Sequence, residues 1–139
     1  MVRGMSLLEE ARRALEEAER ELQRYLKTKE KVVFRDACEK AWMATFLATD
    51  HLLMVYGFEK PRSGNERRRG LVELEKRVSK AKELGLRDRF GSRAYHLHSI
   101  GFYEGLLEVD ELKLEIEKIR EYLEIVEELS RRQLQRNPP

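Results

Sequence analysis

The spacing of apolar residues constrains this chain more than any other feature of its sequence. Leucine, alanine, isoleucine and valine recur every three or four positions through most of its 139 residues. The clearest repeats are Leu8, Ala11, Leu15, Ala18 and Leu22 near the start, and Leu112, Ile116, Ile119, Leu123 and Val126 near the end. Such spacing places apolar side chains along one face of an α-helix. No segment alternates as a half-buried strand would, so the sequence predicts an all-α, up-and-down bundle of four or five helices.

Local capping and breaking signals divide the repeats into five helices. Counted from their N-caps, the predicted helices cover about residues 6–27, 30–56, 66–84, 92–107 and 110–130. Ser6, Ser92 and Asp110 are good N-cap residues, while Gly57 and Gly85 suit helix C-termini. We expect residues 1–130 to form a single helical-bundle domain and the basic residues 131–139 to form a frayed C-terminal tail.

Composition narrows the classes of function. Charged residues make up 39% of the chain, yet its net charge is only +2. Such balance is typical of solvated helix faces and does not mark a nucleic-acid binder. The single cysteine, Cys38, rules out an internal disulfide framework and favours a reducing, cytoplasmic location. No apolar run is long enough to cross a bilayer, and the high Glu, Lys and Arg content resembles that of thermophile proteins.

Residues 92–107, with the sequence SRAYHLHSIGFYEGLL, stand out from this helical background. Three small residues and one histidine fall on one narrow stripe of an α-helix, namely Ala94, Gly101, Gly105 and His98. The small residues allow another helix to approach closely. His98 is the only large polar group on this stripe, so we expect it to be largely buried. His96 lies on the opposite face, and we expect it to be exposed.

The second predicted helix carries a similar stripe. Its members are Ala37, Ala41, Ala44, Ala48, His51 and Val55. Alanines at this spacing permit close helix packing. Two such stripes exceed what one small bundle needs, so the sequence predicts a homodimer.

The histidines and the cysteine offer no metal or cofactor site. His96 and His98 are two residues apart, so on a helix they point about 160° away from each other and cannot share an ion. No Cys/His or carboxylate spacing completes a metal site, and no glycine-rich phosphate loop is present. Cys38 would need His51 or His98 brought beside it by the fold to act as a nucleophile. We therefore expect no metal and no cofactor.

One motif remains, the pair Arg93 and His98, which are separated by four residues. This spacing resembles that of the HEPN superfamily, small helical-bundle proteins with an Arg-x4–6-His motif. The neighbouring residues more closely resemble the archaeal PaREP family, which belongs to this bundle group. The likeness rests on Leu97-His98 followed by Gly101-Phe102-Tyr103-Glu104, and on the block Ala37-Cys38-Glu39-Lys40-Ala41-Trp42-Met43-Ala44.

The resemblance implies a dimeric, toxin-like, metal-independent endoribonuclease, because many HEPN proteins pair two such motifs in one cleft. It implies Arg93 and His98 as the catalytic residues. An imidazole can take the proton from a ribose 2′-hydroxyl, and a guanidinium can hold the scissile phosphate. Contacts to RNA or to an antitoxin-like partner protein are expected from Arg67, Arg68, Arg69, Tyr103 and Glu104.

Two alternatives stay open. The bundle could hold RNA, a nucleotide or a partner protein without cleaving anything, or it could be a purely structural dimer with His98 buried and Arg93 on the surface. Ala94 and Ile100 favour these alternatives, because nuclease members often carry a polar residue directly after the arginine and some carry a tyrosine two residues after the histidine. On an ideal α-helix Arg93 and His98 also point about 140° apart.

Overall fold

The computed structural model describes residues 4–137, and every element within that range is helical. The elements are α1 (Leu7–Thr28), α2 (Lys31–Val55), α3 (Gly64–Arg77), α4 (Ser79–Glu83), α5 (Leu86–Arg93), the π-helix η1 (Ala94–Glu104) and α6 (Val109–Arg136). The all-α prediction is confirmed for this part of the chain. None of these helices combines the length and the apolar character that a membrane span requires.

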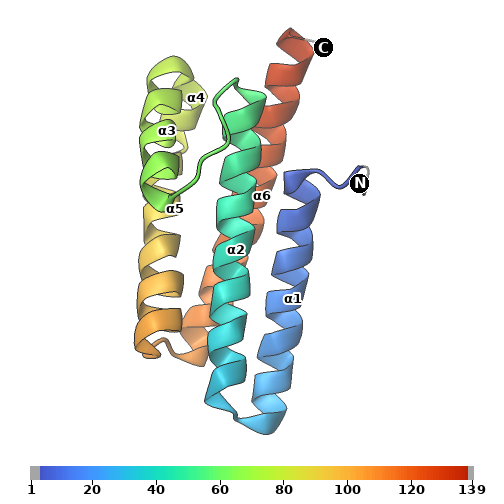
Figure 1. The fold of residues 1–139 in the computed structure, drawn as a ribbon, viewed down its shortest axis with the longest axis vertical. Helices are drawn as coiled ribbons and strands as arrows, with labels where there is room; N and C mark the ends of the chain where they lie inside the picture. The colour runs from blue at the N-terminus through green and yellow to red at the C-terminus, as the bar shows by residue number, and fades with distance from the viewer. Residues whose placement is uncertain (1–3, 138–139) are drawn as a thin grey trace.

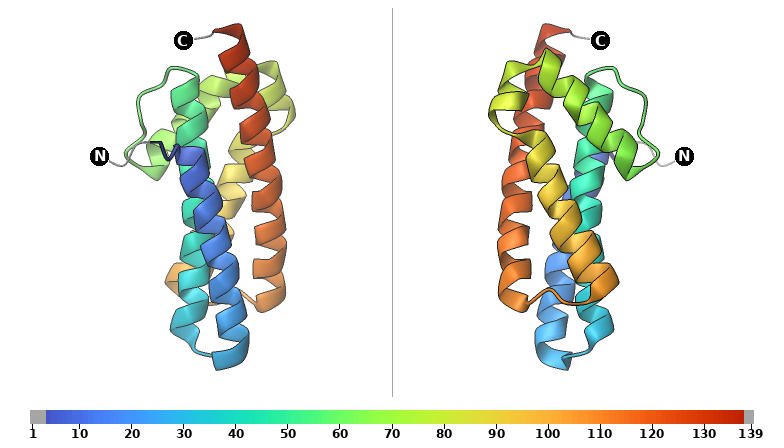
Figure 2. Two further views of the ribbon diagram at one scale, coloured as in Figure 1. Left: turned by 90° about the vertical axis from the view of Figure 1, so that its right-hand side faces the viewer. Right: turned by 90° about the vertical axis from the view of Figure 1, so that its left-hand side faces the viewer.

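The long helices stand side by side and alternate in direction (Figure 1). α5 continues directly into η1, so that the two form one rod beside α2. α1, α2, this rod and α6 make up the up-and-down bundle. The short helices α3 and α4 lie across the end of the bundle at which α2 finishes, and they connect α2 to α5 (Figure 2).

Small side chains bring the helices close together. The alanines of the predicted stripe on α2, which are Ala37, Ala41, Ala44 and Ala48, are all fully buried. The alanine part of the stripe is therefore covered within one chain, whereas His51 and Val55 at its end are half-buried. Tyr122 of α6 is also fully buried, and its hydroxyl shares a 2.7 Å hydrogen bond with the Thr49 hydroxyl of α2. Burial raises the pKa of Tyr122, so this link between helices stays protonated at neutral pH.

The third predicted helix, 66–84, is wrong in its length. It breaks at Val78, whose backbone is extended (φ −122°, ψ 102°). The break turns the chain between α3 and α4, and Leu74 before it and Ala81 after it are both fully buried.

The start predicted for the fourth helix is also wrong. The helix begins at Leu86, and Ser92 lies inside α5. Leu86 and Phe90 are one turn apart and both buried. A carboxylate oxygen of Glu75 accepts the backbone N–H of Arg87 at 2.9 Å, which satisfies one of the free donors of the first turn. Together these contacts outweigh the N-cap preference of Ser92.

The last helix extends beyond its predicted range at both ends. Its N-cap is Glu108 rather than Asp110, and it continues to Arg136. The hydroxyl of Tyr56 donates to the Leu129 carbonyl at 3.2 Å, which ties α6 to the end of α2. Residues 131–136, predicted to be part of a frayed tail, thus continue the helix, and residues 138–139 lie outside the described range.

The largest departure from the sequence pattern is η1 itself. A π-helix bonds residue i to residue i+5, so each turn holds more residues than an α-helical turn. Side chains spaced for one α-helical stripe therefore diverge. Gly101 is buried, but Ala94 is only half-buried and Gly105 is exposed. Leu97, outside the predicted stripe, is fully buried instead.

The two glycines of the predicted stripe have different roles. A Cβ at Gly101 would lie 2.8 Å from the Cys38 sulfur, so η1 packs on α2 at a distance that only glycine allows. Gly105 has a left-handed backbone (φ +67°), and its N–H donates to the Ile100 carbonyl, which ends η1. A Cβ there would lie 2.6 Å from the guanidinium of Arg35.

We expect Gly101→Ala to lower the free energy of unfolding by about 1–3 kcal/mol, because the added methyl group overpacks the contact with Cys38. Gly91→Ala is the matched control: Gly91 is in α5, and a Cβ there meets no atom within 4 Å. This control should raise the free energy of unfolding by about 0.5–1 kcal/mol through helix propensity. Urea denaturation measures both, and equal effects would contradict the close contact.

Candidate functional site

A groove of about 800 Å³ lies where the α5–η1 rod meets α2 and the start of α3. Its lining comes from three places in the sequence. The lining residues are Trp42 of α2, Gly64, Asn65 and Arg68 of α3, and Arg87, Asp88, Phe90, Gly91, Ser92, Ala94, Tyr95, His96 and His98 of the rod. Trp42 and Phe90 are almost fully buried, and their ring centroids are 5.2 Å apart. They form an apolar, aromatic floor.

The rim of the groove is polar and mostly basic. A guanidinium nitrogen of Arg68 donates to the Asn65 side-chain oxygen at 2.8 Å, which holds both at the groove edge. Arg87 lies on the rim with Asp88, at a distance of 3.8 Å between their charged groups. Tyr95 is 58% exposed, so its ring is available to a bound molecule. The groove therefore combines flat apolar surface with exposed cations.

His98 is held at the groove by four neighbours. Its Nδ1 lies 3.3 Å from a carboxylate oxygen of Glu39. Its ring stacks near Trp42 and Phe102, with centroids at 5.7 and 6.1 Å, and the Tyr103 ring meets it edge-on at 4.8 Å. Because a carboxylate only accepts hydrogen bonds, Nδ1 carries the proton in this contact. In the neutral ring, Nε2 is then the proton acceptor.

The burial predicted for the two histidines is wrong. The His98 side chain is 35% exposed, and His96 is half-buried rather than exposed. Both histidines nevertheless line the same groove. Sequence spacing placed them on opposite faces.

Arg93 is the last residue of α5 and is nearly buried. Its Nε donates to a carboxylate oxygen of Glu115 in α6 at 2.6 Å, and Nη1 donates to the Arg89 carbonyl at 3.3 Å. His98, in contrast, contacts Glu39 in α2. The two members of the Arg-x4-His pair thus bind carboxylates on different helices, and Arg93 does not line the groove. The structure does not bring their polar groups to a common point within one chain.

The three arginines at the start of α3 have different environments. Arg67 makes a bidentate ion pair with Asp50, at 2.8 and 3.1 Å, and lies over the Phe46 ring at 4.4 Å. Asp50 is buried, so this pair is structural and ties α3 to α2. Arg69 pairs with Glu73 at 3.7 Å, outside the groove. Only Arg68 lines the groove.

Tyr103 and Glu104 lie at the end of η1 and are both exposed. Neither lines the groove, although the Tyr103 ring contacts His98. The carboxylates that hold other predicted site residues, Glu39, Asp50 and Glu115, are not predicted as their partners from the sequence. The position of Glu115 does indicate a buried carboxylate, because it follows Leu112 by three residues on the apolar face of its helix.

Cys38 is buried, which makes it poorly suited to act as a nucleophile. Burial, with a smaller effect of the Glu39 charge, raises the pKa of its thiol to about 12. The thiolate, which is the reactive form, is therefore scarce near neutral pH. Within residues 4–137 no group of three or more His, Cys, Asp or Glu side chains is placed to hold a metal ion.

We expect Arg93→Ala to lower the free energy of unfolding by about 3–5 kcal/mol, because it leaves the Glu115 carboxylate buried without its partner. The double variant Arg93→Met with Glu115→Leu removes both charges and should recover most of that loss. Urea denaturation measures both. A loss below about 1 kcal/mol for Arg93→Ala, as for an exposed pair, would contradict the buried ion pair.

Comparison with known proteins shows the family to which this chain belongs. No curated protein and no solved structure matches the chain. A model of the archaeal PaREP1/PaREP8 family matches residues 7–123, which run from the start of α1 into α6 and include the whole groove. The resemblance to PaREP proteins is thereby confirmed, and the chain belongs to the archaeal PaREP1/PaREP8 family.

Proposed function

We propose that this protein binds single-stranded RNA in the groove between α2, α3 and the α5–η1 rod. The observation that carries the proposal is the combination of an aromatic floor with cations on the rim. Unstacked bases bind by stacking on aromatic side chains, and the backbone binds through Lys and Arg. Tyr95, which is 58% exposed, supplies an aromatic face, the buried rings of Trp42 and Phe90 supply an apolar floor, and Arg68 and Arg87 supply the charge.

The remaining lining residues suit a nucleotide as well. Asn65, Ser92 and the two histidines can donate and accept hydrogen bonds, which the edges of a base and a ribose hydroxyl both require. A duplex would hide its bases from the aromatic floor, so the geometry favours a single strand. The resemblance to HEPN proteins, many of which act on RNA, supports RNA as the nucleic acid.

Trp42 is the only tryptophan of the chain and lines the groove, so its fluorescence reports on occupancy. We expect single-stranded RNA to change this fluorescence in a saturable way. Tyr95→Ala should weaken binding by about 1–3 kcal/mol through lost stacking. Arg68→Ala should also weaken it, whereas Arg69→Ala, one residue away and outside the groove, should not.

Two results would contradict this proposal. In the first, the anisotropy of a labelled RNA strand shows that binding is saturated, but the Trp42 fluorescence does not change. The RNA would then bind outside the groove. The other is an equal loss of affinity for Arg68→Ala and Arg69→Ala, which would indicate a diffuse effect of net charge.

A second candidate function is metal-independent RNA cleavage, and the His98–Glu39 contact favours it. A carboxylate on Nδ1 orients the ring and supports Nε2 as a base toward a ribose 2′-hydroxyl. This candidate also includes the homodimer, with an antitoxin-like protein as a further partner. Support for a dimer comes from Tyr95, Tyr103 and Leu106, which are exposed along and after η1.

For this candidate we expect cleavage of single-stranded RNA in EDTA by a protein that sediments at twice its monomer mass. His98→Ala should abolish cleavage, while His96→Ala should retain it. Products should carry a 2′,3′-cyclic phosphate or a 3′-phosphate, and 2′-O-methylated RNA should resist. The double variant Arg93→Met with Glu115→Leu tests the predicted role of Arg93 without leaving a buried charge. Cleavage that survives His98→Ala would rule out this chemistry.

A further inference from the structure

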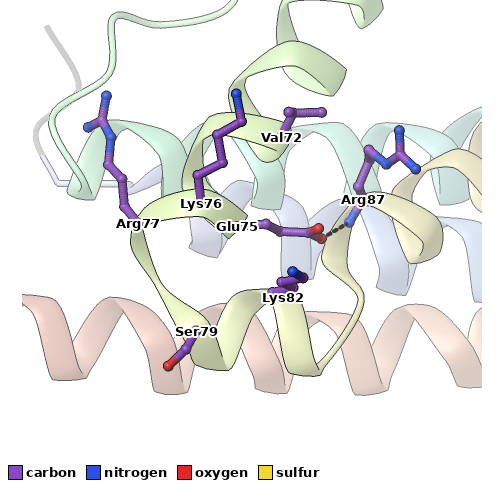
Figure 3. A pocket seen from close by; sticks show the side chains of 7 residues that line it. All are labelled: Val72, Glu75, Lys76, Arg77, Ser79, Lys82 and Arg87. Atoms are coloured by element: carbon purple, nitrogen blue, oxygen red, sulfur yellow. Dashed lines mark hydrogen bonds between the residues drawn. The ribbon is translucent and has the colours of Figure 1, made fainter.

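A second, basic pocket lies beside the groove. It has a volume of about 490 Å³ and is formed by the end of α3, by α4 and by the start of α5. Four cationic side chains line it, together with Val72, Glu75 and Ser79; the cations are Lys76, Arg77, Lys82 and Arg87 (Figure 3).

The one carboxylate of the pocket is already engaged. An oxygen of Glu75 accepts the backbone N–H of Arg87 at 2.9 Å, and Figure 3 shows this bond at the centre of the pocket. Glu75 thus fixes the start of α5. Its single charge is outnumbered by the cations around it, so the pocket has a positive potential that attracts an anion.

The cations are free to meet a ligand. Lys76, Lys82 and Arg87 are all exposed. Lys82 makes no ion pair within residues 4–137, and Lys76 contacts only the half-exposed Glu73, at 3.2 Å. Arg77 lies over the Phe58 ring at 4.6 Å, which leaves its charge available at the pocket edge. Within residues 4–137, Lys82 and Arg77 have no ion pair, whereas Lys76 and Arg87 each contact one carboxylate at the surface, Glu73 and Asp88.

Arg87 connects the two cavities. It lines both the basic pocket and the aromatic groove, because it sits at the first turn of α5 between α3 and α4. A strand with one base on the groove floor therefore meets Arg87 where it leaves the groove. The next surface beyond Arg87 is the pocket formed by Lys76 and Lys82.

We propose that the basic pocket binds the phosphodiester backbone of the same RNA strand, so that groove and pocket form one track with Arg87 at the junction. This inference rests on the proposed RNA binding. The groove holds a base through apolar contact, and the pocket holds backbone phosphates through lysine and arginine charge. Flexible lysines suit repeated phosphates at variable positions, since each contributes as a point charge.

The experiment measures the salt dependence of RNA binding by fluorescence anisotropy, with a labelled oligouridylate longer than the groove. The test variant is Lys76→Gln with Lys82→Gln. The control is Lys80→Gln with Lys113→Gln, which removes the same charge from outside the pocket. For a single strand, each lost phosphate contact lowers the slope of log affinity against log salt by about 0.7.

We expect the test variant to bind the oligomer more weakly and with a slope reduced by about 1.4, which corresponds to two phosphate contacts at about 0.7 each. A mononucleotide, read by Trp42 fluorescence, should bind the wild type and the test variant equally, because it occupies the groove alone. The control variant should keep the wild-type slope.

The outcomes separate this inference from the proposed function. If the oligomer binds and quenches Trp42 but both double variants have the same slope, the groove binds RNA and the pocket does not. If the wild type binds no RNA, both proposals are overturned. A third outcome concerns anionic lipid vesicles. If the wild type binds them, the test variant does not, and both bind RNA equally, the pocket binds another phosphate-bearing partner and the inference is overturned.

Discussion

The contact between η1 and α2 at Gly101 and Cys38 positions most of the groove. Because glycine carries no side chain there, the π-helix lies against α2 closely enough for its neighbours to reach α2 side chains. His98, three residues earlier, meets Glu39 and Trp42, which are one and four residues beyond Cys38. A bulkier residue at Gly101 would move the rod away from α2 and change the aromatic floor and the histidine contact together.

The sequence predicts those helices whose apolar residues repeat regularly, and it fails where packing changes the helix itself. α1, α2 and α6 follow from the spacing of Leu, Ala and Ile, and their starts fall within two residues of prediction. η1 could not be predicted, because the residue types of 92–107 do not distinguish i→i+5 bonding from the i→i+4 bonding of an α-helix. The change to i→i+5 bonding at Ala94 separates Ala94 from Gly101 and Gly105, which α-helical spacing would place on one stripe.

Of the predicted site residues only His98 and Arg68 line the groove, and the sequence does not predict which partners these residues have. His98, Arg68 and Arg93 stand out in the sequence as polar groups in a helical background. Their environments depend on contacts distant in the chain: His98 with Glu39 is 59 residues apart, and Arg93 with Glu115 is 22 apart. No local spacing encodes such pairs. Arg93 therefore looked like half of a catalytic motif, and the fold gives it a buried carboxylate partner.

The same pairing explains why a net charge of +2 understates the basic character of one face. Asp50 and Glu115 are buried and each neutralises one arginine, Arg67 and Arg93, inside the fold. Exposed pairs along α1 and α6 balance further charges at the surface. Lys82, Arg87 and Arg68 lie together on α3 to α5, where the carboxylates are fewer or engaged with the backbone. Composition averages over the whole chain. A balanced total therefore does not exclude nucleic-acid binding when the fold gathers exposed cations beside an aromatic groove.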